Sequence, residues 1–332
     1  MLRFVLGVLI ILRVSQAYAV TEEEFPTVFP NQILPYYEQE GRSHFFTAKD
    51  GVKLHYRAFV KPGQEQALVI FPGRTEPTIK YAEVVWDLRD LNFAVYILDH
   101  RGQGASGRLV DDPEMQYVED FEDYVDDADQ FFDTVIKPAG YSKVKGLAHS
   151  MGANIMSWFS IRHPGVLKSM VFSSPMLDIP AAPFFHEKIA YGVISFLSGI
   201  GLAKSYVYGQ GPFDENETYR GTNSMVRYRA FHALRIARKQ ERVGGVSYRF
   251  VKEAIRATWY MRERAAELRE PILLLQAGSD EVVLTGGQDY VCQQAKNCRK
   301  VAFPEARHEI HIEKDSIRQT WMSEARAFLA AP

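Results

Sequence analysis

One turn, within residues 143–152, constrains the fold of this chain more than any other feature. An apolar run flanked by lysines ends at Ala148, Ser150 follows, and Gly152 opens a segment with helical character. Small residues on both sides of a serine fit a tight turn from a buried strand into a helix, because a larger side chain would clash where the helix passes close to the strand. Such a turn exposes the serine hydroxyl beside the N–H groups of a helix N-terminus. Ser150 is therefore a candidate nucleophile.

Two further residues follow later strands in the order that a serine nucleophile requires. Asp280 follows the apolar run 272–276, and His308 follows the last apolar run, 300–303. Nucleophile, then acid, then histidine is the chain order of the triad in α/β-hydrolases. In this interpretation His308 takes the proton from Ser150 and returns it to the leaving group, while Asp280 fixes the histidine tautomer. The simpler alternatives are that Asp280 caps a helix and that His308 is a surface loop residue.

Four other residues complete the candidate catalytic site. Glu281 and His311 are the alternative acid and base. An oxyanion hole needs two backbone N–H groups, and Met151, directly after the nucleophile, supplies the first. The loop after the first buried strand supplies the second, which we expect from Arg74.

The distribution of apolar runs predicts the fold class. Buried strands alternate with helix-prone segments, which predicts a parallel sheet covered by helices on both faces. Asp50-Gly51 between two alternating runs predicts a hairpin that adds an antiparallel edge. We therefore expect an α/β-hydrolase fold with a mostly parallel, eight-stranded sheet. The alternation stops over residues 176–261, where a helix-prone stretch rich in aromatic residues predicts a helical cap.

The chain is divided accordingly into five parts. They are a signal peptide (1–19), a polar, proline-broken and extended lead-in (20–43), the first part of the core (44–175), the cap (176–261) and the second part of the core (262–332).

The N-terminal part has the pattern of a secretory signal. A basic start is followed by nine apolar residues and by Ala17-Tyr18-Ala19, a typical cleavage site. The apolar run is too short to cross a bilayer, which needs about 20 residues. We therefore expect cleavage after Ala19 and an exported protein, periplasmic or secreted, with association with a membrane as a further expectation. The alternative is an uncleaved amphipathic anchor, because Arg13 follows the apolar run closely.

The two cysteines, Cys292 and Cys298, lie past this signal, in a compartment that permits disulfides. A Cys292–Cys298 disulfide and two free thiols are equal alternatives at this point. Two cysteines alone do not make a zinc site, and the sequence contains no cofactor or metal motif.

Charge is balanced overall but not locally. The chain has 39 basic and 41 acidic residues, which argues against a nucleic-acid partner. Residues 111–133 carry 11 acidic residues and no basic one, whereas residues 220–264 carry 12 Lys and Arg against three Glu. The basic stretch has two interpretations: it binds a phosphate headgroup or an anionic bilayer, or it is a solvated face or pairs with the acidic segment.

Six short motifs carry a resemblance to a known family. They are residues 73–76, 80–83, 99–108, 123–127, 148–152 and 308–310. Together they resemble the bacterial lysophospholipase L(2) family, which is close to the monoacylglycerol lipases. The likeness runs from about residue 44 to the C-terminus. Pro72-Gly73 stands where monoacylglycerol lipases have His-Gly, which favours the lysophospholipase side.

The resemblance implies an activity and a set of residues. The activity is hydrolysis of the remaining acyl ester of a lysophospholipid, with acyl transfer to another lipid as an addition. Ser150, Asp280 and His308 match the triad of the family, and Tyr81 and His149 are assigned to substrate binding together with unidentified cap residues. No cofactor is implied.

Besides its basic stretch, the cap contains an apolar segment suited to contact with a lipid. Its apolar segment 189–197 would line an acyl tunnel, touch a membrane surface, or serve only as a buried cap helix. The alternative activities are those of a monoacylglycerol lipase or a general carboxylesterase. A non-catalytic binding protein with a hydrolase fold is an alternative of another class, against which the intact triad residues argue.

Overall fold

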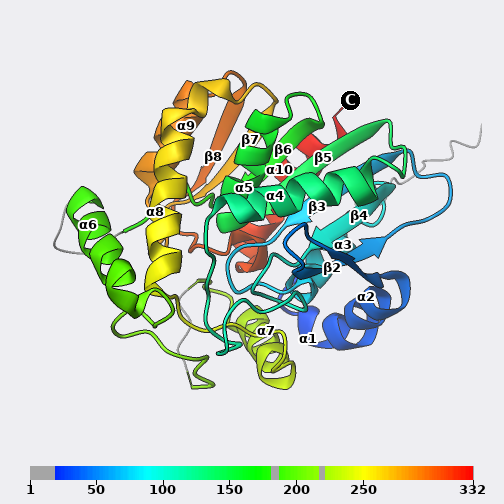
Figure 1. Ribbon diagram of the computed structural model, residues 1–332. Coiled ribbons are helices and arrows are strands. Elements are labelled where there is room, and N and C mark those ends of the chain that lie inside the picture. Colours follow the sequence, from blue (N-terminus) through cyan, green and yellow to red (C-terminus); the bar gives the residue numbers. More distant parts are fainter. Residues whose placement is uncertain (1–18, 181–186, 217–220, 332) are drawn as a thin grey trace, which may run out of the picture.

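The structure is a computed structural model that describes residues 19–180, 187–216 and 221–331 (Figure 1). The predicted signal peptide, apart from Ala19, lies outside the described residues. The strands are β1 (Arg42–Thr47), β2 (Lys53–Phe59), β3 (Gln66–Phe71), β4 (Phe93–Leu98), β5 (Lys143–His149), β6 (Leu167–Ser173), β7 (Ile272–Ala277) and β8 (Cys298–Phe303). They form one sheet in the order β1-β2-β4-β3-β5-β6-β7-β8.

The direction of the strands follows the sequence pattern. Strands β3 to β8 run parallel to one another, and their central members are apolar runs buried on both faces. The hairpin of β1 and β2 turns at Asp50-Gly51, where the glycine has a φ of 90°, and it joins the sheet antiparallel to β4. The prediction of a mostly parallel, eight-stranded sheet with an antiparallel edge is confirmed.

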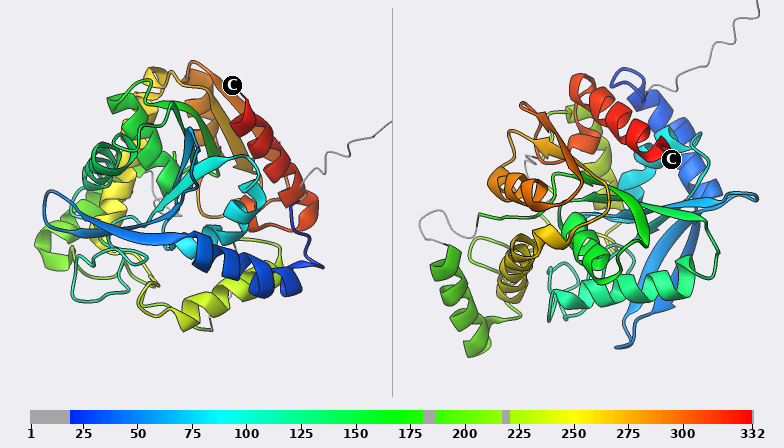
Figure 2. Two further views of the ribbon diagram at one scale, coloured as in Figure 1. Left: turned by 90° about the vertical axis from the view of Figure 1, so that its right-hand side faces the viewer. Right: turned by 90° about the horizontal axis from the view of Figure 1, so that it is seen from above.

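Helices cover both faces of the sheet, as predicted (Figure 2). One apolar cluster joins the sheet to α4 (Glu122–Phe131), α5 (Met151–Arg162), α8 (Tyr248–Glu263) and α9 (Thr285–Gln294). A second cluster joins the other face to α1 (Phe25–Val28), α2 (Leu34–Glu40), α3 (Ala82–Leu88), α7 (Met225–Ala237) and α10 (Asp315–Ala330). The remaining helical elements are α6 (Glu187–Leu197), the π-helical turns η1 (Phe29–Ile33), η3 (Phe132–Ile136) and η4 (Ser198–Leu202), and the 3₁₀ turns η2 (Thr78–Tyr81), η5 (Ala265–Glu267) and η6 (Ile310–Ile312).

The N-terminal lead-in is helical, and the expectation of an extended segment was wrong. A stripe of residues four positions apart, Phe25, Phe29, Ile33 and Tyr37, is buried against the second cluster. Each of the three prolines stands in the first turn of a new helical element, α1, η1 or α2, where its missing N–H is tolerated.

The residues just before these helices are also part of the fold. Ala19 and Val20 are buried. The carbonyl of Ala19 accepts a hydrogen bond from Gln319 of α10 at 2.8 Å, and the carbonyl of Val20 accepts one from Arg227 of α7 at 2.6 Å.

Only part of the predicted cap stands away from the sheet. Helix α8 packs on α5, where Tyr260 stacks on Trp158 with 3.7 Å between ring centroids, and α7 buries Phe231 in the second cluster. The predicted boundary at residue 261 therefore falls inside a helix that covers the sheet. Helix α6 projects at the side of the molecule and packs on α8 (Figure 1).

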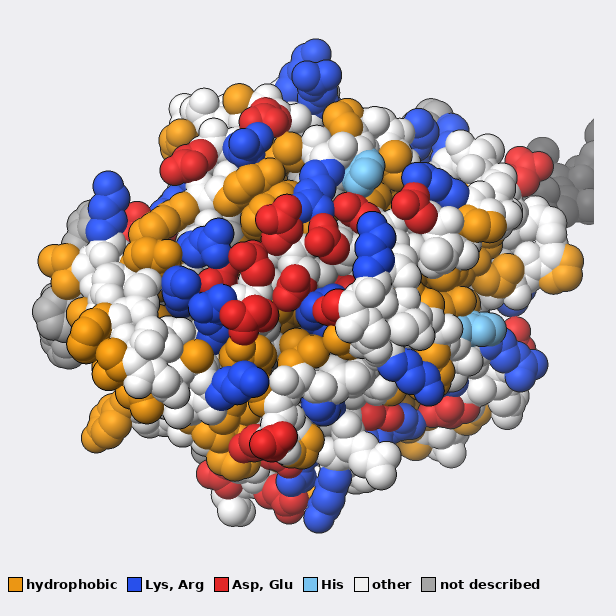
Figure 3. All heavy atoms as spheres, in the orientation of Figure 1, with side chains coloured by type: hydrophobic (Ala, Val, Ile, Leu, Met, Phe, Trp, Pro, Cys, Tyr) orange, Lys and Arg blue, Asp and Glu red, His pale blue; other side chains and the backbone are white. Residues whose placement is uncertain are grey.

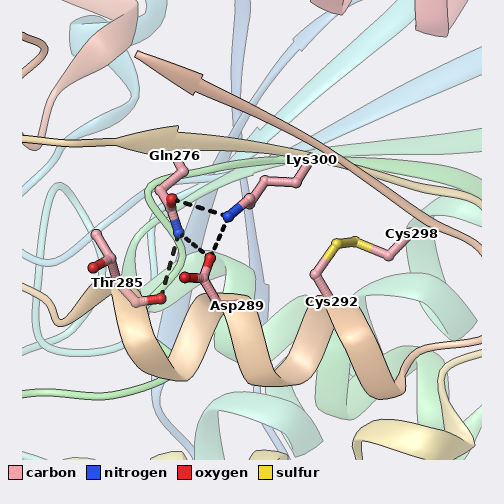
Figure 4. Close-up of a disulfide and its surroundings, with 6 residues drawn as sticks. All are labelled: Gln276, Thr285, Asp289, Cys292, Cys298 and Lys300. Carbon is pink, nitrogen blue, oxygen red and sulfur yellow. Dashed lines mark hydrogen bonds and ion pairs between the residues drawn. A yellow bond between two sulfur atoms is a disulfide. The ribbon is translucent and has the colours of Figure 1, made fainter. Parts of the chain in front are cut away.

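A disulfide ties the edge strand to a covering helix (Figure 4). It joins Cys292 near the end of α9 to Cys298 at the start of β8, so the structure contains the bonded alternative. Close by, Asp289 of α9 accepts hydrogen bonds from Gln276 of β7 at 2.8 Å and from Lys300 of β8 at 2.5 Å. These contacts fix α9 on β7 and β8, and the loop from β7 to α9 is the one that carries Asp280.

Candidate active site

The turn after β5 holds Ser150 in a rare backbone conformation. Its φ is 48° and its ψ is −117°, a combination that costs an L-residue about 1–3 kcal/mol. Two hydrogen bonds maintain it: the N–H of Ser150 donates to the carbonyl of Ser173 on β6 at 3.1 Å, and its carbonyl accepts from the N–H of Met176 at 3.0 Å. A Cβ atom at Gly152 would lie 2.2 Å from the carbonyl oxygen of Phe71, so position 152 requires a glycine.

The structure brings Ser150, Asp280 and His308 together. Nε2 of His308 lies 2.9 Å from Oγ of Ser150, and Nδ1 lies 2.7 Å from Oδ2 of Asp280. The other carboxylate oxygen of Asp280 accepts the N–H groups of Val282 and Val283 at 2.8 and 3.0 Å. Ser150 follows β5, Asp280 follows β7 and His308 follows β8, so the carboxyl ends of parallel strands bring the three residues to one end of the sheet. This is the geometry of a serine nucleophile with its base and orienting acid.

Burial and contacts set the protonation of this pair. Burial lowers the pKa of His308, the hydrogen bond to Asp280 raises it in part, and the charge of His149 lowers it again, so the pKa lies below the ordinary value of 6.5. Burial alone would raise the pKa of Asp280. The hydrogen bond and charge of His308, with two backbone N–H groups, outweigh burial and lower that pKa. His308 is therefore a neutral base beside a charged carboxylate at neutral pH.

The alternative acid and base lie elsewhere. Glu281 is exposed, and the His308 ring is bonded to Asp280 instead. His311 is buried and stacks on Tyr81 with 5.3 Å between ring centroids. Burial, followed by the charge of His149, holds the pKa of His311 well below its ordinary range.

The segments that carry the two expected oxyanion donors begin side by side at the end of the sheet. Phe71 at the end of β3 is paired with Ala148 of β5, so the loop that carries Arg74 starts beside the turn that carries Met151. Gln103 shapes this loop, because its amide donates to the carbonyl of Gly73 at 2.9 Å and accepts from the N–H of Thr75 at 3.3 Å. The backbone of Arg74 is thereby held between two fixed residues.

Tyr81 and His149, which the resemblance assigned to substrate binding, lie behind the triad. Both side chains are buried. The hydroxyl of Tyr81 donates to Oε2 of Glu76 at 2.6 Å, and Nδ1 of His149 lies 3.1 Å from the same oxygen. Their hydrogen bonds are with Glu76 and with the backbone of His308, so they support the groups around the triad.

His149 is held as a cation. One ring nitrogen faces the carboxylate of Glu76 and the other lies 3.2 Å from the carbonyl of His308, so both nitrogens face acceptors. Burial lowers the pKa of His149, but the charge of Glu76 and its hydrogen bond outweigh this and raise it. A positive charge is therefore fixed directly behind His308.

Sequence reasoning missed the anions that balance this charge. Glu76 bonds to Lys80 at 2.8 Å, and Lys80 also bonds to Glu309. Burial raises the pKa of Glu76, but His149 and Lys80 outweigh it and lower that pKa well below the ordinary value. The sequence does contain a signal for this ion pair, because Glu76 and Lys80 carry opposite charges and are four residues apart.

The sheet, the serine on its strained turn and the buried aspartate–histidine pair define a serine hydrolase with the α/β-hydrolase fold. Residues 63–315 match the family described as "Serine aminopeptidase, S33". The chain is 33% identical to lysophospholipase L2 of Escherichia coli over 311 residues, covering 90% of this chain and 89% of that protein. It is 26% identical to human monoglyceride lipase, covering 93% and 95%. The chain therefore belongs to the lysophospholipase L2 family of ester hydrolases.

Solved structures share the fold. A carboxyl esterase from Bacillus coagulans superposes with a TM-score of 0.68 at 16% identity, covering 88% of this chain and 98% of the esterase. A monoglyceride lipase from Saccharomyces cerevisiae superposes with a TM-score of 0.67 at 16% identity, covering 87% and 95%.

Proposed function

We propose that the protein is a lysophospholipase that cleaves the acyl ester of its substrate through an acyl-enzyme on Ser150. The observation that carries this proposal is the hydrogen-bonded chain from Ser150 through His308 to Asp280 in a protein 33% identical to a lysophospholipase L2 along 90% of its length.

The mechanism follows from the geometry. The hydroxyl oxygen of Ser150 attacks the ester carbonyl while Nε2 of His308 takes the proton. The backbone N–H groups of Met151 and Arg74 stabilise the oxyanion, and His308 then protonates the glycerol oxygen that leaves. Water, deprotonated by His308, attacks the acyl-enzyme, releases the fatty acid and restores the Ser150 hydroxyl. Asp280 keeps Nδ1 of His308 protonated throughout.

The test is a lipid panel assayed with the parent protein and with Ser150→Ala. The parent should release fatty acid from lysophospholipids, and Ser150→Ala should lower kcat by about 10⁴-fold or more, because the nucleophile is absent. Ser157→Ala is the matched control, since that hydroxyl bonds only within α5, to the carbonyl of Ala153 at 2.7 Å. A fluorophosphonate probe should label the parent and the control but not Ser150→Ala. Full activity of Ser150→Ala would contradict the mechanism.

A second candidate is a monoacylglycerol lipase, which the similarity to human monoglyceride lipase favours. The two activities differ in whether the leaving group carries a phosphodiester. A higher kcat/KM on monoacylglycerol than on the lysophospholipid with the same acyl chain would support this second candidate over the first.

The proposal includes contact with a membrane surface through α6 and η4. Four apolar side chains spaced to share one helical face, Ile189, Val193, Phe196 and Ile200, are each at least half exposed. Such a face is suited to lie in the lipid interface, where the substrates of a lysophospholipase are found. Within the described ranges, no helix is long and apolar enough to cross a membrane.

The proposal also includes export. The supporting observations are the sequence pattern that ends at Ala19 and the Cys292–Cys298 disulfide, a bond that persists in oxidising compartments. N-terminal sequencing of protein recovered from outside the cytoplasm should give Val20 as the first residue. A chain that keeps its first residues there would overturn cleavage at this site.

A further inference from the structure

A hollow lies beside the expected oxyanion loop. It encloses about 790 Å³ including its open mouth, and its lining combines Arg74 and Thr75 of that loop with Arg235 of α7 and with residues 209–214 and 244–245. The residue whose N–H is expected to bind the ester oxyanion therefore also lines the hollow.

Hydrogen bonds and a close backbone contact hold the walls of this hollow together. The N–H of Gly245 donates to the carbonyl of Gly211 at 2.8 Å. A Cβ atom at Gly244 would lie 2.6 Å from the backbone nitrogen of Phe213, so the two backbone segments are in direct contact. The carboxylate of Glu114 accepts a hydrogen bond from the N–H of Phe213 at 2.7 Å, and the backbone carbonyl of Glu114 accepts one from the N–H of Gly244, also at 2.7 Å. The shape of the hollow thus does not depend on a ligand.

Two guanidinium groups are oriented along the same wall. Arg74 donates to the carbonyl of Gly244 at 3.0 Å, and Arg235 donates to the carbonyl of Val243 at 3.0 Å. The guanidinium of Arg235 also lies over the ring of Phe213, 4.1 Å from its centroid. Among the described residues of the lining, the acidic side chain is that of Asp214, which is exposed.

Seven arginines of the basic stretch have a structural role. They bond to carboxylates, as in Arg227–Glu83, Arg238–Glu38, Arg242–Glu114, Arg249–Glu119, Arg256–Asp120, Arg262–Asp178 and Arg264–Glu267. Three of these partners belong to the acidic segment 111–133, so the two segments pair, which is one of the alternatives that the sequence left open. Figure 3 shows the face of the molecule seen in Figure 1, where acidic side chains gather near the centre and basic side chains border them.

We propose that the hollow receives the phosphodiester of the lysophospholipid headgroup, with Arg235 as a specificity-determining residue beside Arg74. The inference rests on the proposed function and adds the group that separates lysophospholipid from monoacylglycerol. Only the glycerol carbons lie between the acyl ester and the phosphodiester, a span comparable to an arginine side chain. An ester held at Ser150 and at the N–H of Arg74 therefore presents its phosphate to the guanidinium groups, whose planar donors suit a phosphodiester.

The test compares two substrates with one acyl chain, a lysophosphatidylglycerol and the matching monoacylglycerol, on Arg235→Gln. Loss of a hydrogen bond to a charged group should lower kcat/KM on the lysophospholipid about 10- to 100-fold, mainly through KM. Activity on monoacylglycerol should stay within about twofold of the parent, because that substrate has no phosphate. Arg235→Lys should recover part of the loss. Arg74 is not substituted, since its backbone belongs to the expected oxyanion hole.

Arg256→Gln is the control, because this arginine of α8 bonds to Asp120 and Glu253 away from the hollow. It should leave the ratio of the two substrates unchanged. Equal losses on both substrates in Arg235→Gln, or an unchanged ratio, would overturn the headgroup site. A parent protein that cleaves monoacylglycerol but no lysophospholipid would instead overturn the proposed function, so the two failures are distinguishable.

Discussion

The rim of the sheet, where the carboxyl ends of β5, β7 and β8 carry the triad, differs from helix α6 in the surroundings of its side chains. At the rim, buried charges are matched within the protein: Glu76 is placed against His149 and Lys80, and Asp280 against His308. On α6, apolar side chains such as Phe196 point to the outside. The polar groups of the rim are therefore matched within the protein, whereas α6 exposes apolar surface of the kind that the proposed lipid contact would cover.

The difference extends to how each region is anchored. The triad residues follow strands that are paired on both sides or tied by a disulfide to α9. Helix α6 buries only a narrow stripe, with Ala190 and Ile194 facing inward, and Tyr191 packs on Trp259 of α8 with 4.8 Å between ring centroids. We therefore expect changes at the rim to act on chemistry and changes on α6 to act on lipid binding.

The largest expected effect is that of Asp280→Asn. An amide cannot hold His308 in the tautomer that accepts the Ser150 proton, so kcat on a soluble short-chain ester should fall by about 10⁴-fold. Asp133→Asn is the matched control, because this exposed carboxylate of η3 bonds to Lys137 of the same segment. If Asp280→Asn kept most of its activity, the rim would not work as described.

A smaller effect is expected from Val193→Ser with Phe196→Ser on α6. Each apolar side chain buried in lipid contributes about 1.5–3 kcal/mol, so binding to anionic vesicles should weaken at least about tenfold, while turnover of a soluble ester stays at the parental level. The matched control is Phe45→Ser with Val60→Ser, which removes two similarly exposed residues near the far edge of the sheet. Vesicle sedimentation distinguishes the pairs, and equal binding by both would remove α6 as the docking face.

The smallest expected effect concerns pH. Catalysis needs neutral His308, and its pKa is lowered, so kcat/KM should decline on acidification with a midpoint below 6.5. The α6 double variant should give the same midpoint on a soluble ester, because neither substitution changes a charge. A pH–rate profile with a midpoint above 6.5 would mean that burial and the charge of His149 do not outweigh the hydrogen bond from His308 to Asp280.

The sequence predicted the rim better than its surroundings. Each triad residue follows an apolar strand, and parallel strands bring their carboxyl ends together, so one-dimensional order was enough to place Ser150 and His308. The helical N-terminus was missed because three prolines suggested breaks, although each starts a helical element. Burial of Tyr81 depends on contacts with Glu76 and His311, which no local pattern contains.

The burial of Ala19 and Val20 bears on when the proposed cleavage after Ala19 takes place. A peptidase must draw the bond it cuts into its own cleft as an extended segment, and in the folded protein this bond is clamped between α7 and α10. The cleavage that we propose at this bond would consequently precede the formation of these contacts.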